Sequence, residues 1–418
     1  MSQYKSEIKD TLWLTILQSV NYLVPIIIWP YLMVVLGAVG FGRFTFGLSV
    51  AQYLILIIDF GFNLSATKKI AMARDNRSEI NRIFSATMRA KAYLLGVCLV
   101  VIVVLCLIPR FYVYRYVLLV FAVMVMFATF SFIWLYQGIG KMSVVSAVNC
   151  IAKISILPIT FLLVHEAEDV LLAAAIQAAV FVVSSSVSYI IIRRHKYASF
   201  VSVTHAEALT ELSDGLPVFI STAATSLYTG LFVVVLACFV MPDEVGIYAA
   251  ADKIMRCSCN MFFIPLAQAF FPRVSQLSEE DKDRGEHLIV QLLLLMSSLM
   301  IAVGLTLFFL AEPICAYFSA DYAGIGSIAR IIAPVPLLVG IGGICGQEGL
   351  LALGDEEEKR TFRRIYLYAA LVALVAVVPL TFFFGSIGTA VSVLLTEAFV
   401  SVSMVCAYLR KHPNPLRP

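Results

Sequence analysis

The chain has 418 residues, of which 61% are hydrophobic and 14% are charged, and its formal net charge is +3. Soluble domains carry about 25% charged residues, so the composition excludes an ordinary soluble enzyme and predicts an integral membrane protein. The first apolar stretch, residues 12–36, is too long for the core of a cleavable signal peptide and indicates a retained first span.

Twelve apolar segments approach or exceed the roughly 20 residues that a membrane-spanning helix needs. We expect spans at residues 12–36, 44–64, 90–109, 116–136, 144–164, 170–192, 215–240, 246–271, 288–311, 325–352, 365–384 and 388–409. The predicted fold is an all-α membrane protein of about 12 transmembrane helices.

The basic residues predict the orientation of these spans. With both termini in the cytoplasm, the cytoplasmic segments, from Lys5 to Arg417, hold 23 of the 30 Lys and Arg residues, with Lys91 at the edge of the third span counted among them. The opposite side holds three (Arg43, Arg110 and Arg115), and the spans hold four. Because cytoplasmic loops are enriched in Lys and Arg, this distribution predicts an N-in, C-in protein with an even number of spans.

The longer connections are then all cytoplasmic, at residues 65–89, 193–214, 272–287 and 353–364. The first contains Ile80, Ile83 and Phe84 at helical spacing beside many charges. Two interpretations stay open for it: an amphipathic helix along the membrane surface, or a solvated basic loop.

Two similar segments suggest that the chain consists of two halves. GAVGFGRF at 37–44 follows the first span, and PDEVGIY at 242–248 follows the seventh. Each places Val-Gly within two residues of an aromatic side chain. We therefore expect two six-helix lobes, residues 1–200 and 201–418, related by a parallel repeat as in secondary transporters.

The tenth span is the richest in helix-breaking residues. Pro334 and Pro336 precede five glycines between 340 and 349. Such backbone suits a hinge in a transporter. Gly342 and Gly346 also have the spacing of close helix packing, so a packing role is the alternative.

Apart from Lys91, at the edge of the third span, eight ionisable residues lie inside the expected spans, where charge is costly and usually functional: Asp59, Lys153, Asp252, Lys253, Arg256, Arg330, Glu348 and Glu397. Lys153, near the middle of its span, is the strongest candidate for binding substrate. Lys253 and Arg256 share a helix face and could converge with Lys153 on an anion such as a phosphate. The alternative is that Asp252 neutralises Arg256 through an i,i+4 ion pair.

The other deep charges have weaker assignments. Arg330 is a further substrate-binding candidate unless its side chain simply extends to the outer interface. Glu348, Glu397, Asp59 and Asp252 are candidates for coupling transport to a proton or sodium ion. A local ion pair of Asp59 with Lys68 or Lys69 is an equal alternative, and Asp252 is expected to be held by Arg256.

Motifs for catalysis and cofactor binding are missing from the sequence. It has no phosphate-binding loop, no H-E-x-x-H and no G-x-S-x-G. Cys257 and Cys259 lack the spacing of common zinc motifs, and the five histidines form no ligand pair. We expect no enzyme activity, no cofactor, no metal and no nucleic-acid partner.

The segments GFGRFTFGLSVAQYLILIIDFGFNLSATKKIA (40–71) and VGIYAAADKIMRCSCNMFFIPLAQAFFPRVS (245–275) resemble the Wzx-type oligosaccharide flippases. These belong to the multidrug/oligosaccharidyl-lipid/polysaccharide exporter superfamily. The resemblance covers essentially the whole chain and implies two six-helix bundles of the MATE-like fold. It also implies movement of undecaprenyl-pyrophosphate-linked O-antigen repeat units from the cytoplasmic to the periplasmic leaflet. Membrane lipids, an O-antigen polymerase and a chain-length regulator are the further partners expected.

Other functions are open at this stage. A flippase for another lipid-linked glycan (capsule, exopolysaccharide or common antigen) would have the same features. A multidrug cation exporter would favour acidic groups where this chain has Lys153, Lys253 and Arg256. A polymerase or ligase would carry a large periplasmic loop, and lipid II flippases look like proteins of fourteen spans.

The topology can be tested with alkaline phosphatase fusions, which are active only in the periplasm. We expect activity for fusions after Arg43, Arg110, Glu168, Asp243, Glu312 and Ser386. Fusions after Arg77, Lys141, His195, Asp281 and Glu358 should be inactive. Activity after Asp281 would contradict the parallel repeat.

Overall fold

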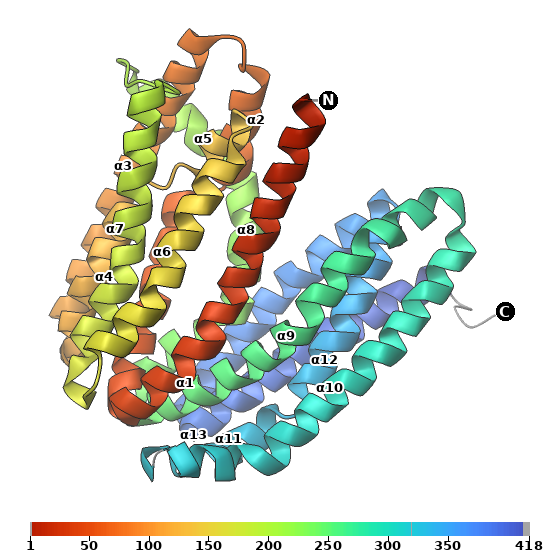
Figure 1. Cartoon of the computed structure of the whole chain (residues 1–418). Helices are drawn as coiled ribbons and strands as arrows, with labels where there is room; N and C mark the ends of the chain where they lie inside the picture. The colour runs from red at the N-terminus through yellow and green to blue at the C-terminus, as the bar shows by residue number, and fades with distance from the viewer. Residues whose placement is uncertain (1, 319, 413–418) are drawn as a thin grey trace. The chain divides into compact units, whose positions relative to one another are not determined.

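The computed structural model describes residues 2–318 and 320–412, and every regular element in these ranges is helical. Arg417, counted above among the cytoplasmic charges, lies outside them. The helices, labelled in Figure 1, are α1 (Ser2–Asp59), α2 (Phe62–Met72), α3 (Arg77–Leu107), α4 (Arg115–Ala128), α5 (Ile133–Gly138), α6 (Met142–Leu163), α7 (Val170–His195), α8 (His205–Phe239), α9 (Pro242–Glu280), α10 (Lys282–Phe318), α11 (Ile325–Ile332), α12 (Val335–Gly343) and α13 (Glu356–Lys411), with the short 3-10 helices η1 (Pro109–Tyr114), η2 (Ala167–Asp169) and η3 (Ala320–Tyr322) and the π-helix η4 (Ile344–Leu353).

These helices confirm the all-α membrane fold. Nine helical segments of the described residues are long and apolar enough to cross a membrane, or ten with α8, which is bent by 61°. α1 and α13 each contain two of the expected spans, because each is interrupted at one glycine with positive φ, Gly37 (63°) and Gly385 (57°). Counting both halves of these two helices accounts for all twelve predicted spans.

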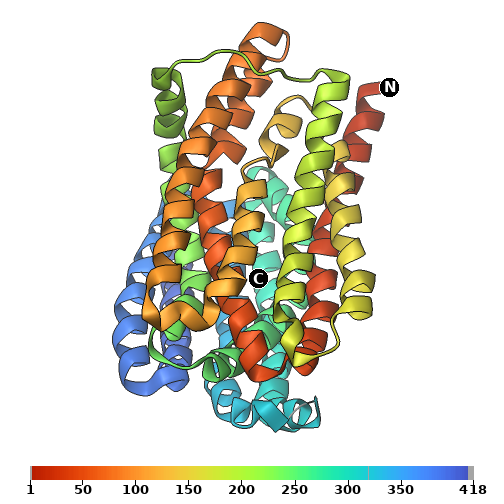
Figure 2. The same cartoon turned by 90° about the vertical axis from the view of Figure 1, so that its left-hand side faces the viewer.

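The chain forms two compact units, each a bundle of helices running side by side (Figure 1, and Figure 2 from a second side). Unit 1 comprises Met1–Leu36 and Arg43–Ala223, and unit 2 comprises Gly37–Gly42 and Ala224–Pro418. The main boundary between the units lies between residues 223 and 224, inside α8. The division into lobes 1–200 and 201–418 stays a prediction.

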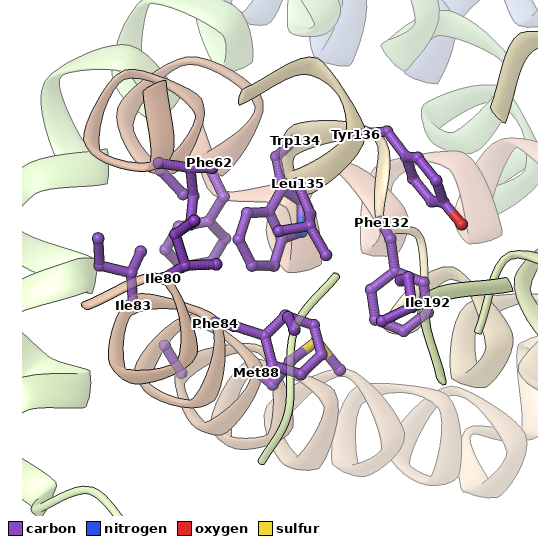
Figure 3. Close-up of a cluster of buried hydrophobic side chains, with 14 of the residues drawn as sticks. Phe62, Ile80, Ile83, Phe84, Met88, Phe132, Trp134, Leu135, Tyr136 and Ile192 are labelled. Atoms are coloured by element: carbon purple, nitrogen blue, oxygen red, sulfur yellow. The ribbon is translucent and has the colours of Figure 1, made fainter. Parts of the chain in front are cut away.

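A cluster of buried apolar side chains lies at the end of unit 1 where α2, α3 and α5 meet (Figure 3). The solvated loop expected within 65–89 is wrong for residues 77–89, which belong to α3, whereas the helical spacing of Ile80, Ile83 and Phe84 is confirmed. The Asn76 side chain caps α3 by accepting a hydrogen bond from the Glu79 backbone N–H at 3.2 Å. Ile80, Ile83 and Phe84 face the cluster with exposed fractions of 5%, 7% and 1%.

Aromatic rings fill the centre of the same cluster. The ring of Phe84 lies 5.9 Å, between centroids, from both Trp134 and Phe132, and Figure 3 shows Phe84 near both. Trp134 is fully buried and comes from α5, a helix of six residues. Stacked rings of this size contribute both buried area and preferred geometry, so they fix the N-terminal end of α3 against α5.

In unit 2, the glycine-rich residues 37–42 of α1 pack against the first residues of α9, backbone on backbone. A Cβ atom added to Gly42 would lie 1.8 Å from the Pro242 carbonyl oxygen. One added to Gly246 would lie 1.9 Å from the Ala38 carbonyl oxygen. These are the two segments whose similarity suggested the repeat, and the structure brings them into direct contact within one unit.

The interruption of α13 is supported by a side chain from α9. Glu244 Oε1 accepts a hydrogen bond from the backbone N–H of Ser386 at 2.8 Å, directly after Gly385. A helix that restarts leaves its first N–H groups without intrahelical partners. The Glu244 carboxylate satisfies one of them and places negative charge at the new helix start.

The tenth span is broken, as its prolines predicted. α11 ends at Ile332, α12 begins at Val335, and from Ile344 to Leu353 the backbone is a π-helix. π-Helical turns are rare and are frequent at functional sites. The mechanical role of this span stays a prediction.

Two glycine substitutions should separate close packing from mere helix flexibility. We expect Gly42→Ala and Gly246→Ala to lower the thermal unfolding temperature of the purified protein, because the backbone must shift, at a cost of about 1–3 kcal/mol. Gly96→Ala, in α3 with nothing within 4 Å of the added Cβ, is the control. It should be neutral or gain about 0.5–1 kcal/mol. Equal behaviour of all three would contradict the close approach.

Candidate functional site

Lys153 lies near the middle of α6, eleven residues after the helix begins at Met142. Its side chain is half-buried and lines two separate cavities within unit 1. Asn149 lies one turn earlier on the same face. A cation at this depth is stable only in polar surroundings, and both cavities provide them.

The first, here called the serine cavity, has a volume of about 180 Å³. Its polar lining is Lys153 and Asn149 of α6, Ser184, Ser185 and Ser188 of α7, and Ser131 between α4 and α5. Among the described residues, the buried hydroxyl of Ser184 has no hydrogen-bond partner, whereas the Ser185 hydroxyl donates to the Phe127 carbonyl at 2.8 Å.

The second, here called the amide cavity, has a volume of about 240 Å³ and lies on the side of α6 and α7 that faces α1. Its polar lining is Lys153, Gln52 and Gln177, and Trp29 contributes an aromatic ring. The two cavities share Lys153, Val180 and Phe181. Together they place one ammonium group among amides and hydroxyls, a combination suited to an anionic, hydroxyl-rich ligand.

Asp59 has a different partner from the one expected. It is the last residue of α1, before a turn at Phe60 and Gly61 with φ of 38° and 79°. Its Oδ1 accepts from Lys91 Nζ on α3 at 3.3 Å, and Lys91 is fully buried.

The expected pair of Asp59 with Lys68 or Lys69 is therefore wrong. Lys69 instead pairs with Glu211 and Asp214 of α8, at 2.8 and 2.6 Å. Lys91 Nζ also donates to the carbonyl of Ser131, which lines the serine cavity, at 3.4 Å. The Asp59–Lys91 pair thus stands next to that cavity.

In unit 2, the ion pair expected from the i,i+4 spacing of Asp252 and Arg256 is present. Arg256 Nε donates to Asp252 Oδ1 at 2.9 Å. Glu397 of α13, 6% exposed, acts on the same guanidinium through its charge. Lys253 lies within electrostatic range of Asp252 and Arg256. Two cations and two carboxylates therefore form one balanced cluster rather than a purely cationic surface.

One part of the Arg256 guanidinium is not used by this cluster. Its Nη2 is buried and has no hydrogen-bond partner among the described residues. A buried donor without a partner is costly, and a ligand oxygen or a water molecule is the natural acceptor. Arg256 can therefore contact an anion while remaining paired with Asp252.

Glu348 and Arg330 occupy opposite environments in unit 2. Glu348, in the π-helix η4, is 0% exposed, and both its carboxylate oxygens lack a hydrogen-bond partner within the described ranges. Arg330 is exposed near the end of α11. Lys153 and Asp59 belong to unit 1, whereas the other six candidate residues belong to unit 2.

Several lining residues escaped prediction because they are uncharged. Asn149, Gln52 and Gln177 are amides inside expected spans, and a search for polar residues at membrane depth would have found them. Lys91 was assigned to a cytoplasmic connection. Across the described part of the chain, no group of three or more His, Cys, Asp or Glu side chains could hold a metal ion.

Comparison with known proteins extends over almost the whole chain. Residues 8–278 match the family model of polysaccharide biosynthesis proteins. A candidate O-antigen transporter of Escherichia coli (strain K12) is 29% identical over 406 residues, which is 97% of each chain. A second, from Shigella dysenteriae, is 30% identical over 400 residues, covering 96% of this chain and 99% of that one.

Solved structures support the same fold. A lipid II flippase MurJ in an inward closed conformation matches with a TM-score of 0.70 at 13% identity, over 98% of this chain and 91% of that one. An inward-facing multidrug resistance MATE family transporter of the MOP superfamily matches with a TM-score of 0.62 at 15% identity, over 94% and 98%. At these identities the likeness shows the MATE-like fold alone.

Proposed function

Since the chain belongs to the polysaccharide biosynthesis protein family, we propose that it is a flippase for undecaprenyl-pyrophosphate-linked O-antigen repeat units. It moves them from the cytoplasmic to the periplasmic leaflet of the bacterial inner membrane. The observation that carries this proposal is the match of 97% of the chain to a candidate O-antigen transporter. A fold of the MATE type, which also serves lipid II flippases, agrees with it.

The Lys153 cavities supply the chemistry that such a substrate requires. A sugar diphosphate cannot enter hydrocarbon unaided, because burying an unpaired charge costs many kcal/mol. In our proposal, Lys153 contacts the diphosphate, and the amides and hydroxyls around it replace water around the sugar. The ring of Trp29 offers an apolar face to a sugar ring. The polyprenyl chain stays in lipid.

Arg256 is the second proposed contact of the diphosphate. Its buried Nη2 retains the capacity to donate, and Lys253 adds a further cation. Asp252 and Glu397 hold the guanidinium in place when no substrate is bound. Arg330, which is exposed, serves in this proposal at the outer end of the pathway.

The transport cycle that we propose is alternating access. The cavity around Lys153 opens in turn to each side of the membrane while the head group is inside. No nucleotide-binding motif is present in the sequence, so direction comes from an ion gradient or from consumption of the product outside. An O-antigen polymerase and a chain-length regulator are the proposed consumers and partners.

The proposal is tested by removing and restoring the gene. Deletion in the host should abolish surface O-antigen and leave the lipid-linked repeat unit in the cytoplasmic leaflet. Purified protein in liposomes should move a fluorescent lipid-linked oligosaccharide to the outer leaflet, where an impermeant quencher reaches it. A deletion strain with normal surface O-antigen but lacking capsule or common antigen would instead assign a different glycan.

Substitutions at the two proposed phosphate contacts should reduce flipping without removing the protein from the membrane. We expect Lys153→Ala to slow flipping at least about tenfold, because a charge-assisted hydrogen bond contributes about 1.5–3 kcal/mol. Lys153→Arg should retain more activity than Lys153→Ala, and Arg256→Lys more than Arg256→Ala. The control is Lys141→Ala, an exposed lysine just before α6. Full activity of both alanine variants would contradict the proposed contacts.

Proton coupling should depend on the deep carboxylates of unit 2. We propose that Glu348 or Glu397 exchanges the coupling proton, since a buried carboxyl group can take up a proton. Glu348 has no hydrogen-bond partner among the described residues, and Glu397 could be released from Arg256 when a substrate anion binds there. In liposomes with an internal pH dye, Glu348→Gln or Glu397→Gln should abolish substrate-dependent proton flux. Glu356→Gln, at an exposed site, is the control. Flux that survives both buried substitutions would exclude these residues.

A further inference from the structure

An apolar groove runs between α4 and α7 on the outside of unit 1, away from the Lys153 cavities. The two helices pack side by side, and the groove encloses about 550 Å³. All ten lining residues are apolar apart from one tyrosine: Tyr116, Leu119, Val120, Val123, Leu171, Ala175, Ala178, Ala179, Val182 and Val183. Leu119 and Val183 are 49% and 50% exposed, so this face is open to the membrane.

Small side chains line the α7 side of the groove, and its lining residues define its length. Ala175, Ala178 and Ala179 leave space along α7, and larger side chains form the walls. Its α7 residues run from Leu171 to Val183, which corresponds to about 18 Å at a rise of 1.5 Å per residue. One leaflet of a bilayer has a hydrocarbon thickness of about 15 Å. The groove therefore matches one acyl chain, whereas an undecaprenyl chain is far longer.

An arginine stands at one end of this groove. Arg115 Nη2 donates to the hydroxyl of Tyr116 at 3.0 Å, and its guanidinium carbon lies 4.9 Å from the centre of the Tyr116 ring. The ring of Tyr112 lies 5.8 Å from the same carbon. Because Tyr116 lines the groove, these contacts hold a partly exposed cation at its mouth.

The position of Arg115 is unusual for a membrane protein of this topology. Only three Lys or Arg residues are expected on the periplasmic side, and Arg110 and Arg115 both belong to the segment that leads into α4. Basic residues are depleted on that side, so their retention beside an apolar groove indicates an anionic partner. A phosphate held by Arg and a chain in the groove together describe a phospholipid.

We propose that this groove binds one acyl chain of an anionic phospholipid of the periplasmic leaflet, with its phosphate on Arg115. A lipid with net negative charge is favoured over phosphatidylethanolamine, whose ammonium group lies near the guanidinium and is repelled by it. The site is separate from the proposed substrate pathway and does not depend on the substrate being O-antigen. The lipid would stabilise the contact of α4 with α7, and α7 also lines both Lys153 cavities.

Native mass spectrometry of the purified full chain, titrated with phosphatidylglycerol or with phosphatidylethanolamine, tests the proposal. We expect phosphatidylglycerol to bind more tightly, and Arg115→Gln to reduce its binding at least about threefold while leaving that of phosphatidylethanolamine unchanged. Ala179→Leu keeps Arg115 and fills the groove, so it should weaken binding of both lipids. Ile190→Phe enlarges an exposed α7 side chain outside the groove and is the matched control.

Three outcomes would overturn the proposal. They are equal binding of the two lipids to the unaltered chain, unchanged binding in Ala179→Leu, and displacement of phosphatidylglycerol by an equimolar polyprenyl pyrophosphate in an Arg115-dependent manner. The last would assign the groove to the transported lipid. If Arg115→Gln does not fold, Ala179→Leu and the comparison of lipids decide the question.

Discussion

The structure depends on one constraint: inside hydrocarbon, every backbone N–H and C=O group must find its partner within the protein. This explains why every regular element of the described residues is helical and why an interruption within a span keeps its backbone hydrogen bonds. Even between the two spans of α13, where the helix restarts after Gly385, the Ser386 N–H is bonded to Glu244. In the tenth span, the backbone changes to a π-helix rather than to an open loop.

The same constraint applied to side chains divides the deep charges into two groups. Arg256 with Asp252, and Lys91 with Asp59, are paired within one unit, so each can remain buried without a ligand. Lys153 borders two polar cavities, and Glu348 has no hydrogen-bond partner among the described residues. Paired charges maintain a structure, whereas groups facing a cavity or lacking donors are suited to exchange a ligand or a proton. In our proposal, Lys153 and Glu348 act from the second group. Arg256 combines both properties, because its Nε is paired with Asp252 while its Nη2 has no hydrogen-bond partner among the described residues.

Local pattern predicted the spans and the Asp252–Arg256 pair, because hydropathy and helical spacing are properties of neighbouring residues. It failed where distant segments meet. Lys91 was counted as a cytoplasmic charge, yet it is fully buried against Asp59, 32 residues away. Ile80 and Phe84 were assigned to a surface helix or a solvated loop, because the polar residues around them hid their packing into the buried cluster of unit 1. The cavities around Lys153 require α1, α6 and α7 together, which no single segment reveals.

The glycine contact between residues 37–42 and α9 limits how members of this family can be recombined. That short segment is encoded in the first half of the gene but packs as part of unit 2, with Gly42 against Pro242 and Gly246 against Ala38. A chimera that joins the first half of one homologue to the second half of another would separate two surfaces that fit to within van der Waals contact. In a workable exchange of halves, residues 37–42 come from the homologue that supplies the second half. They are inserted into the first helix of the homologue that supplies the first half.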